Sequence, residues 1–255
     1  MSLQRTAYTV VSLLGSLMLL GCQGPAVGGR QSGPIRVVVV TGGHDFEAKP
    51  FQEMFVAFPR MTVTFAPQQD DSEVFEDIAG WDYDVIVLYN MSQKISPERQ
   101  KHLLQLVHRG VGVVALHHCL AAFQEWDGYA DLIGGRYFLS ERSFGGRSYQ
   151  PSTYKHDEHV QVHVADPGHP VTRGIQDFEI LDEVYKGYAV AQTDHVLLQT
   201  DHPLSEKAIA WVSHGGPGRV VYLELGHDGR AYGNETYRRL LRQAIEWCSA
   251  RKGQP

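Results

Sequence analysis

The stretch IRVVVVTGG, at residues 35–43, decides the class of fold that we expect for this chain. The β-branched run from Ile35 to Val40 is typical of a strand buried on both faces, and the glycines after Thr41 predict a tight turn. Strands of this kind belong to parallel sheets whose two faces are covered by helices. The stretch therefore predicts the first strand of an open α/β sheet.

The residues that follow alternate between helix and strand patterns. Apolar residues with helical spacing predict a helix around Phe51–Phe58, and Ser96 followed by Pro97 predicts the start of another, which ends at Gly110. We expect further strands at residues 61–65, 85–88 and 111–116, with a short crossover helix at 72–79. In such a sheet, ligands bind at the carboxyl ends of the strands.

The second half of the chain is richer in strand patterns. Residues 126–150, rich in glycine and aromatic residues, indicate loops and a short helix over the sheet. Valines alternate with polar residues at 159–165, as in a half-exposed antiparallel strand that carries His159 and His163 on its polar face. We expect later strands at 195–199, 208–212 and 220–223, with His195 and His202 flanking an edge strand, and a final helix at 235–247.

Composition excludes several classes of protein. The chain has 255 residues, 43% hydrophobic and 20% charged, which is typical of a globular protein. A formal net charge of −6 disfavours nucleic acid and an anionic membrane surface as partners. Three cysteines do not make a disulfide framework. The glycine-rich segments lack the spacing of a phosphate or dinucleotide loop, so we expect no nucleotide cofactor.

The N-terminus has the features of an export signal. One basic residue, Arg5, precedes an apolar stretch from Val10 to Leu20, and LLGC at 19–22 resembles a bacterial lipoprotein cleavage site. We therefore expect a signal peptide at 1–21, lipid on Cys22, a flexible tether over 22–34 and one domain at 35–250. An uncleaved membrane anchor is the alternative, but the apolar stretch is shorter than the roughly 20 residues that span a bilayer. These features predict an exported lipoprotein, periplasmic or on the cell surface, that contacts the membrane only through its lipid.

Histidines follow three of the predicted strands, and this placement is the main functional signal among the 13 histidines. His44 precedes Asp45, His117 precedes His118, and His227 precedes Asp228, each pair just after a strand. Strand ends in a parallel sheet share one edge, so these side chains can meet in one crevice. Clustered imidazoles and carboxylates serve as metal ligands or acid/base pairs, although a single such histidine is more often a hydrogen-bonded surface residue.

Several motifs resemble the ThuA-like, or trehalose-utilisation, family. They are TGGHDF (41–46), GVGVVALHH (110–118), LIGGRY (132–137), DPGHPVTRG (166–174), FEILDEVY (178–185) and GHD with AYGN (226–234). This resemblance covers about residues 35–247. It implies the class I glutamine amidotransferase-like superfamily, with a flavodoxin-like sheet, and a role in the metabolism of disaccharides and oxidised (3-keto) sugars.

The resemblance also points to a carboxylate and raises a question about a cysteine. Glu183 matches the glutamate of the family's DE-x-Y pattern, and we interpret Asp182 and Glu183 as lying at a strand end or turn. The superfamily's nucleophilic cysteine sits at a sharp turn after a central strand, but here that turn begins with His117. Cys119, two residues later, is then either a buried thiol or a nucleophile beside His118.

We weigh three functions. The first is an enzyme, of a hydrolase or an isomerase or lyase type, that acts on a small carbohydrate with or without a divalent metal such as zinc. Its catalytic and metal-binding residues are His44, His117, Glu183 and His227, and its substrate-binding residues are Asp45, His118, His156 (just before the 159–165 strand) and Asp228. The alternatives are a Cys119-dependent hydrolase or amidotransferase and a non-catalytic, lipid-tethered sugar-binding protein. The oligomeric state stays open.

Overall fold

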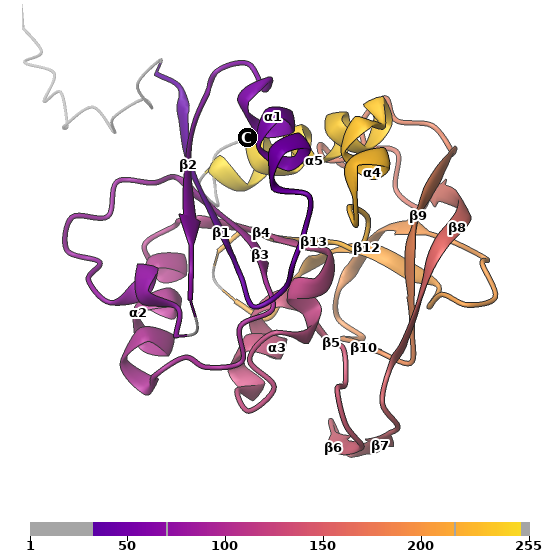
Figure 1. Cartoon of the computed structure of the whole chain (residues 1–255), viewed down its shortest axis with the longest axis horizontal. Coiled ribbons are helices and arrows are strands. Elements are labelled where there is room, and N and C mark those ends of the chain that lie inside the picture. Colours follow the sequence, from indigo (N-terminus) through magenta and orange to yellow (C-terminus); the bar gives the residue numbers. More distant parts are fainter. Residues whose placement is uncertain (1–32, 70, 217, 251–255) are drawn as a thin grey trace, which may run out of the picture. The chain divides into compact units, whose positions relative to one another are not determined.

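A nine-stranded sheet organises the domain, in the order β2-β1-β3-β4-β13-β12-β11-β8-β9. The computed structural model describes residues 33–69, 71–216 and 218–250. The first five strands in this order run parallel to one another, and each later neighbour pairs antiparallel. The predicted open α/β sheet with a β-rich C-terminal half is therefore confirmed (Figure 1).

The strands of the large sheet are β1 (Ile35–Gly42), β2 (Met61–Pro67), β3 (Val85–Asn90), β4 (Gly112–Leu116), β8 (Thr153–Val164), β9 (Phe178–Lys186), β11 (His195–Gln199), β12 (Ala208–Ser213) and β13 (Val220–Leu223). The helices are α1 (Ala48–Val56), α2 (Pro97–His108), α3 (Asp127–Ile133), α4 (Gly229–Gly233) and α5 (Glu235–Ser249), with single 3-10 turns η1 (Glu73–Phe75) and η2 (His117–Ala121).

Two hydrophobic cores cover the two faces of the sheet. Helices α1, α4 and α5 pack on one face, where Phe51 and Leu240 join Val37 and Val39 of β1. Helices α2 and α3 pack on the other, and Figure 1 shows the two groups on opposite sides of the central strands. Every residue of β3 and β4 is buried, which explains their continuous apolar sequence.

The antiparallel half of the sheet returns to the end of the parallel half. Strand β9 is the last strand in the order, four places from β13. Nevertheless, a carboxylate oxygen of Asp182 in β9 accepts a hydrogen bond of 2.8 Å from the backbone N–H of Gly226, just after β13. The sheet must therefore curl, and this curl brings β9 to the carboxyl ends of β4 and β13.

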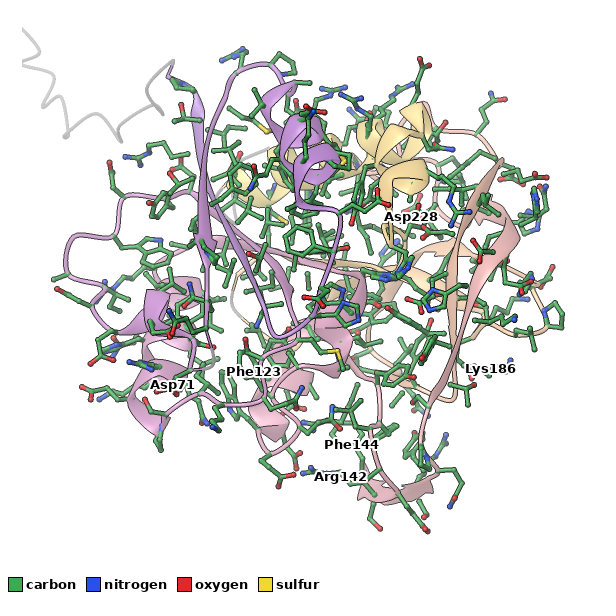
Figure 2. All side chains as sticks on the ribbon, viewed as in Figure 1. Asp71, Phe123, Arg142, Phe144, Lys186 and Asp228 are labelled. Atoms are coloured by element: carbon green, nitrogen blue, oxygen red, sulfur yellow. The ribbon has the colours of Figure 1, made fainter. Side chains whose placement is uncertain are left out.

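Small strands complete the middle region. Strands β6 (Arg142–Phe144) and β7 (Arg147–Tyr149) form a hairpin, while β5 (Gly135–Arg136) pairs with β10 (Ala189–Val190). The hairpin is the lowest part of Figure 1, and Figure 2 labels its side chains Arg142 and Phe144. The expected loops and short helix of residues 126–150 correspond to α3 and this hairpin.

Four expectations about local structure were wrong. Asp182 and Glu183 lie inside β9 rather than at its end, and β8 begins at Thr153, so His156 lies within the strand. Strand β11 is internal because β8 continues the sheet beyond it. The crossover at 72–79 contains only the short turn η1. In the first three cases, pairing with a distant strand outweighs the local pattern.

The N-terminal predictions fall outside what the structure describes. The signal peptide at 1–21, Cys22 and the tether up to residue 32 lie outside the described residues, which begin at Gly33. A compact unit begins at Pro34. Within the described ranges, none of the helices has both the length and the apolar character that crossing a membrane requires.

Candidate functional site

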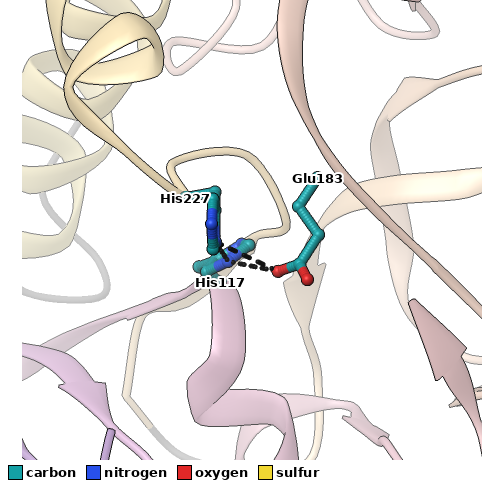
Figure 3. Close-up of side chains that lie close together, drawn as sticks. All are labelled: His117, Glu183 and His227. Atoms are coloured by element: carbon teal, nitrogen blue, oxygen red, sulfur yellow. Dashed lines mark hydrogen bonds and ion pairs between the residues drawn. The ribbon is translucent and has the colours of Figure 1, made fainter. Parts of the chain in front are cut away.

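Three side chains from three separate elements meet at the carboxyl ends of β4 and β13. Oε2 of Glu183 lies 2.9 Å from Nε2 of His117 and 3.2 Å from Nδ1 of His227. The two imidazole nitrogens are 3.3 Å apart. Figure 3 shows the three side chains pointing toward one another, with Glu183 from β9 facing the two histidines. We call this group the His–Glu cluster.

His117 occupies the sharp turn that ends β4. Its backbone is left-handed, with φ of 53°, which is uncommon for a residue other than glycine and is often found at functional sites. Its Nδ1 donates a hydrogen bond of 2.7 Å to the backbone carbonyl oxygen of Glu224. Since a carbonyl oxygen only accepts, this bond places a hydrogen on Nδ1 and turns Nε2 toward Glu183 and the Tyr185 hydroxyl, 2.9 Å away.

Asp182 fixes the loop that carries His227. Its buried carboxylate accepts backbone hydrogen bonds from Gly226 at 2.8 Å, from His227 at 2.9 Å and from Glu183 at 2.9 Å. On the other side of the loop, the Tyr89 hydroxyl donates to the carbonyl oxygen of Gly226 at 2.8 Å. Asp182 therefore acts as a positioning residue rather than as a ligand.

A β-bulge directs His156 toward the same cluster. The register of β8 against β9 shifts between Lys155 and Glu158, where Asp157 has a φ of 62°. Bulges of this kind re-aim side chains. Nδ1 of His156 lies 3.4 Å from Oε1 of Glu183, and its ring centroid is 4.5 Å from that of His227.

The charges of the cluster depend on one another. Burial alone raises the pKa of Glu183, but hydrogen bonds from His117 and His227 outweigh it and hold the pKa well below its usual range. The hydrogen bond with Glu183 in turn raises the pKa of His227, against the opposing effect of burial. The cluster therefore holds a carboxylate that needs a neighbouring positive charge.

His44 and His118 form a separate stack beside the cluster. Their ring centroids are 4.5 Å apart, and the ring of Tyr89 lies 4.3 Å from that of His118. The side chain of His118 is buried, which lowers its pKa well below the usual value, and neither ring nitrogen has a hydrogen-bond partner among the described residues. His44 is exposed and does not belong to the group of atoms close enough to share a metal ion, which consists of His117, Glu183 and His227.

A cavity of about 350 Å³ opens beside Glu183. This volume lies at the lower end of the range that is usual for small-molecule sites. Histidines and tyrosines contribute most of its wall. The lining residues are His44, Met91, His118, Ala121, Tyr137, Leu139, Tyr154, His156, Glu183 and Tyr185. The cavity thus reaches the His–Glu cluster through Glu183 and Tyr185.

Two predicted binding residues have other roles in the structure, and neither lines this cavity. Asp45 is exposed, and its backbone oxygen accepts a hydrogen bond of 2.6 Å from Nδ1 of His44. Asp228 caps α4, since its carboxylate accepts from the backbone N–H of Arg230 at 2.9 Å and pairs with the Arg230 side chain. Figure 2 labels Asp228 beside this helix.

Cys119 belongs to η2, and its side chain lies in the hydrophobic core rather than in the cavity. Burial raises the pKa of its thiol to about 12, so the thiolate that nucleophilic catalysis requires is disfavoured. The Tyr129 hydroxyl donates to the backbone oxygen of Cys119, which holds the turn in place. The structure therefore favours the interpretation of Cys119 as a buried thiol.

Sequence reasoning did not single out Tyr185 as part of the cavity wall, although the aromatic residues of the middle region, Tyr137 and Tyr154 among them, were candidates for a sugar site. Tyr185 contacts His117 with ring centroids 5.0 Å apart, and Tyr137 packs against Tyr185 at 5.3 Å. The signal for Tyr185 was present, because residues two apart in a strand share a face and Tyr185 follows Glu183 by two. Recognising β9 as a strand would have been enough to find it.

Comparisons with known proteins agree with this architecture. The model of the ThuA family, described as trehalose utilisation, matches residues 36–248. A ThuA-like protein from Parabacteroides merdae ATCC 43184 has a TM-score of 0.70 at 17% identity, covering 87% of this chain and 92% of its own. A second, from Bacteroides uniformis ATCC 8492, has a TM-score of 0.63 at 18% identity, covering 87% and 94%.

The wider fold is also represented. PurLQS from Thermotoga maritima has a TM-score of 0.54 at 14% identity, covering 84% of this chain and 99% of its own. No curated protein matches the sequence. At such identities the solved structures bear on the fold alone, an α/β fold that this chain shares with these ThuA-like proteins and with PurLQS.

Proposed function

This chain belongs to the ThuA, or trehalose-utilisation, family, and from that premise we propose that it acts on a small carbohydrate at the His–Glu cluster. The observation that carries the proposal is the meeting of His117, Glu183 and His227 within 3.3 Å beside a cavity. Buried acid and imidazole groups that converge in a cleft are typical of catalytic sites.

A divalent metal such as zinc fits the donor set. The Nδ1 hydrogen of His117 faces a carbonyl oxygen, so a neutral ring presents a lone pair at Nε2, only 2.9 Å from a carboxylate oxygen. Because this nitrogen and this oxygen both carry lone pairs, a cation must lie between them, either a proton or a metal ion. Ligands of a tetrahedral zinc ion lie about 3.4 Å apart, given metal–ligand distances of ~2.0–2.2 Å. The cluster therefore needs to open by only a few tenths of an ångström.

Two imidazoles and one carboxylate suit zinc or another late divalent ion better than magnesium or calcium, which prefer oxygen ligands. Such a set also leaves one coordination position for a substrate or water. When bound there, the ion supplies polarisation of a sugar carbonyl or acidification of a bound water.

The residues around the cluster have separate tasks in this proposal. The backbone oxygen of Glu224 holds the ring of His117, and Asp182 holds the loop of His227. His156, which lies 3.4 Å from Glu183 and lines the cavity, is placed to move a proton to or from the substrate. His118, a buried side chain that lines the cavity, helps to shape the space for the substrate. We propose proton transfer between these side chains and the bound sugar as the reaction class.

The test combines metal analysis with activity. Purified protein is analysed for bound metal and assayed on disaccharides and their 3-keto forms, before and after chelation. Variants His117→Ala and Glu183→Gln are expected to lose metal and at least 100-fold in kcat/KM, the loss usual for such groups. The matched control is His159→Ala, since His159 also pairs with a glutamate, Glu179 at 2.8 Å, but on the exposed face of β8. Full activity of a metal-free protein would refute the metal, and unaltered activity of both variants would refute the site.

The second candidate is a sugar-binding protein without catalysis. The observation in its favour is that the cluster's atoms already pair with one another, as in a structural network. This candidate predicts saturable sugar binding without any change in the sugar, and binding that survives His117→Ala. Product analysis by mass spectrometry after long incubation separates the two.

We also propose that the protein is exported and held at a membrane by lipid on Cys22. The support is the LLGC motif after an apolar stretch, in residues outside the described part of the structure. Mass spectrometry of the mature N-terminus should find a lipid-modified Cys22, and Cys22→Ala should leave residues 1–21 uncut. A native N-terminus that keeps residues 1–21 would indicate the uncleaved anchor instead.

A further inference from the structure

The side chain of Glu224 is buried and has no task in the proposed reaction. Glu224 directly follows β13, and only 1% of it is exposed. Removing a carboxyl group from water costs free energy, and a well-packed apolar side chain in its place is often as stabilising or more so. What this carboxyl group binds must therefore explain its presence.

The two oxygens of the Glu224 carboxyl group bind the end of β9. Oε1 accepts hydrogen bonds from the backbone N–H of Tyr185 at 3.3 Å and from the hydroxyl of Ser205 at 3.4 Å. Oε2 lies 2.6 Å from the hydroxyl of Tyr188, just beyond β9. Strands β9 and β13 stand four places apart in the sheet order, so the carboxyl group joins two strands that do not pair.

The backbone of the same residue holds His117. The carbonyl oxygen of Glu224 accepts the hydrogen bond of 2.7 Å from Nδ1 of His117. The backbone N–H of Glu224 donates to the carbonyl oxygen of Ile209 at 2.8 Å, which extends the pairing of β12 with β13 and fixes this part of the chain. Glu224 therefore binds the turn after β4 with its backbone and β9 with its side chain.

Tyr185 completes a closed path of contacts. Its hydroxyl lies 2.9 Å from Nε2 of His117, and the two rings stack with centroids 5.0 Å apart. The path runs from His117 to the backbone of Glu224, through the Glu224 side chain to the backbone of Tyr185, and through the Tyr185 side chain back to His117. We call this path the Glu224 circuit. All three residues are buried, where water weakens hydrogen bonds little.

The backbone of His117 gives this circuit a purpose. A left-handed backbone costs free energy in a residue other than glycine, and it persists where the surrounding contacts determine it. Glu224 contacts one ring nitrogen of His117 directly, and it holds the tyrosine that contacts the other. The circuit therefore determines how the ring is turned.

We propose that Glu224 is a positioning residue, whose carboxyl group sets the orientation of the His117 ring through Tyr185. Glu224 is not one of the residues that line the cavity, so it acts through these neighbours rather than on a ligand. The inference rests on the proposed function, because His117 is the group whose orientation the proposed chemistry requires. The orientation itself can be measured without a substrate.

A role in stability alone is the competing explanation, because the carboxyl group also binds Ser205 and Tyr188. Such a role predicts that loss of the Glu224 carboxyl group and loss of the Tyr185 hydroxyl act independently, so that their effects multiply. A positioning role predicts that both changes break the same circuit, so that the second change adds little to the first.

The experiment is a double-mutant cycle on the full-length protein. Glu224→Leu removes the carboxyl group, Tyr185→Phe removes the hydroxyl, and a double variant combines the two. Glu224→Gln keeps an oxygen acceptor for Tyr185 and is the rescue variant. Tyr188→Phe is the matched control, because it removes a hydroxyl that binds the same carboxyl group outside the circuit. Circular dichroism checks that each variant folds, and Glu224→Met, with a more adaptable side chain, replaces Glu224→Leu if the latter does not fold.

Two readouts follow the His117 ring and the reaction separately. NMR spectra of isotope-labelled histidine rings, assigned with His117→Ala, report which ring nitrogen of His117 carries a hydrogen. The second readout is kcat/KM on the sugars that the wild type converts. In the wild type, Glu224→Gln and Tyr188→Phe, the His117 signals should be the same, with the hydrogen on Nδ1.

Glu224→Leu and Tyr185→Phe should each change the His117 signals and lower kcat/KM about tenfold, since losing a group that orients a site residue usually costs about 10–100-fold. The double variant should show the signals of Tyr185→Phe and also lose about tenfold, whereas independent effects would give about a hundredfold. Wild-type His117 signals in folded Glu224→Leu, or losses that multiply, overturn the positioning role. If the wild type converts no sugar, the proposed function fails, and the NMR spectra alone then decide the role of Glu224.

Discussion

Replacing Glu224 by glutamine tests whether this buried carboxyl group is neutral in the folded protein. Glu224 is 1% exposed, and burial raises its pKa to about 8. Its Oε2 lies 2.6 Å from the hydroxyl of Tyr188, which also contacts the backbone oxygen of Ala208. A protonated Glu224 can donate to Tyr188 while Tyr188 donates to Ala208, so every hydrogen finds an acceptor.

The effect on stability follows from the shift in pKa. Between its ordinary value of 4.5 and about 8, Glu224 keeps its proton in the folded chain and releases it in the unfolded chain. The stability contributed by this proton is complete below pH 4.5 and is lost as the pH rises through 8. At about 1.36 kcal/mol per unit, the contribution falls by about 4 kcal/mol between pH 5 and pH 9. The glutamine in Glu224→Gln does not titrate, so this variant should not show the pH-dependent loss of stability.

Urea unfolding followed by tryptophan fluorescence at pH 5, 7 and 9 measures the effect. Between pH 5 and pH 9, the free energy of unfolding of the variant should rise by about 4 kcal/mol relative to that of the wild type. This relative change does not depend on how stable the variant is at either pH. Glu53→Gln serves as the control, because the Glu53 side chain is 65% exposed and should follow the wild type. If the difference between wild type and Glu224→Gln changes by less than about 1 kcal/mol over this range, the carboxyl group is charged in the folded protein and the reasoning is wrong.

Three further substitutions test the framework of the site. Asp182→Ala removes the acceptor of three backbone hydrogen bonds. The free energy of unfolding, measured in urea, should fall by about 3 kcal/mol, and the affinity for metal should fall as well. Gly226→Ala would place a methyl group 2.2 Å from the Tyr237 hydroxyl, at a residue whose φ of 117° favours glycine. The melting temperature of this variant should therefore fall by several degrees. The control Gly80→Ala adds a methyl group in open space and should leave the melting temperature unchanged. Cys119→Ala should keep full activity in steady-state assays, and loss of turnover in a folded variant would revive a cysteine mechanism.

The central strands were predictable because their burial is continuous along the sequence. Residues 37–40 are almost completely buried, and a run of valines admits few other interpretations. The helix at 97–108 was equally clear, since Ser96 accepts a hydrogen bond from the backbone N–H of Arg99, as expected of an N-cap. Local preference and tertiary packing agree in these elements.

Strand β9 was not predictable in the same way. Its two acidic residues interrupt the apolar pattern and locally indicate a turn. Asp182 is buried because backbone N–H groups after β13 pair with it, and Glu183 because two histidines surround it. These partners lie far away in the sequence, so a local pattern does not reveal them.

The site itself was partly predictable. His117 and His227 follow parallel strands, whose ends must share an edge, and the structure brings both to Glu183. The positions of His156 and Tyr154 depend on the bulge in β8 and on the curl of the antiparallel half. Neither feature has a signature that one sequence reveals.

The return of β9 onto the ends of β4 and β13 ties ligand occupancy to the integrity of the whole domain. The side chains of the His–Glu cluster come together only after both halves of the sheet have formed, so an unfolded chain offers a ligand no comparable site. A ligand at 100 times its dissociation constant then adds about 2.7 kcal/mol to the folded state. Saturation would slow proteolysis across the entire sheet, and the amount of intact protein would follow the supply of its ligand.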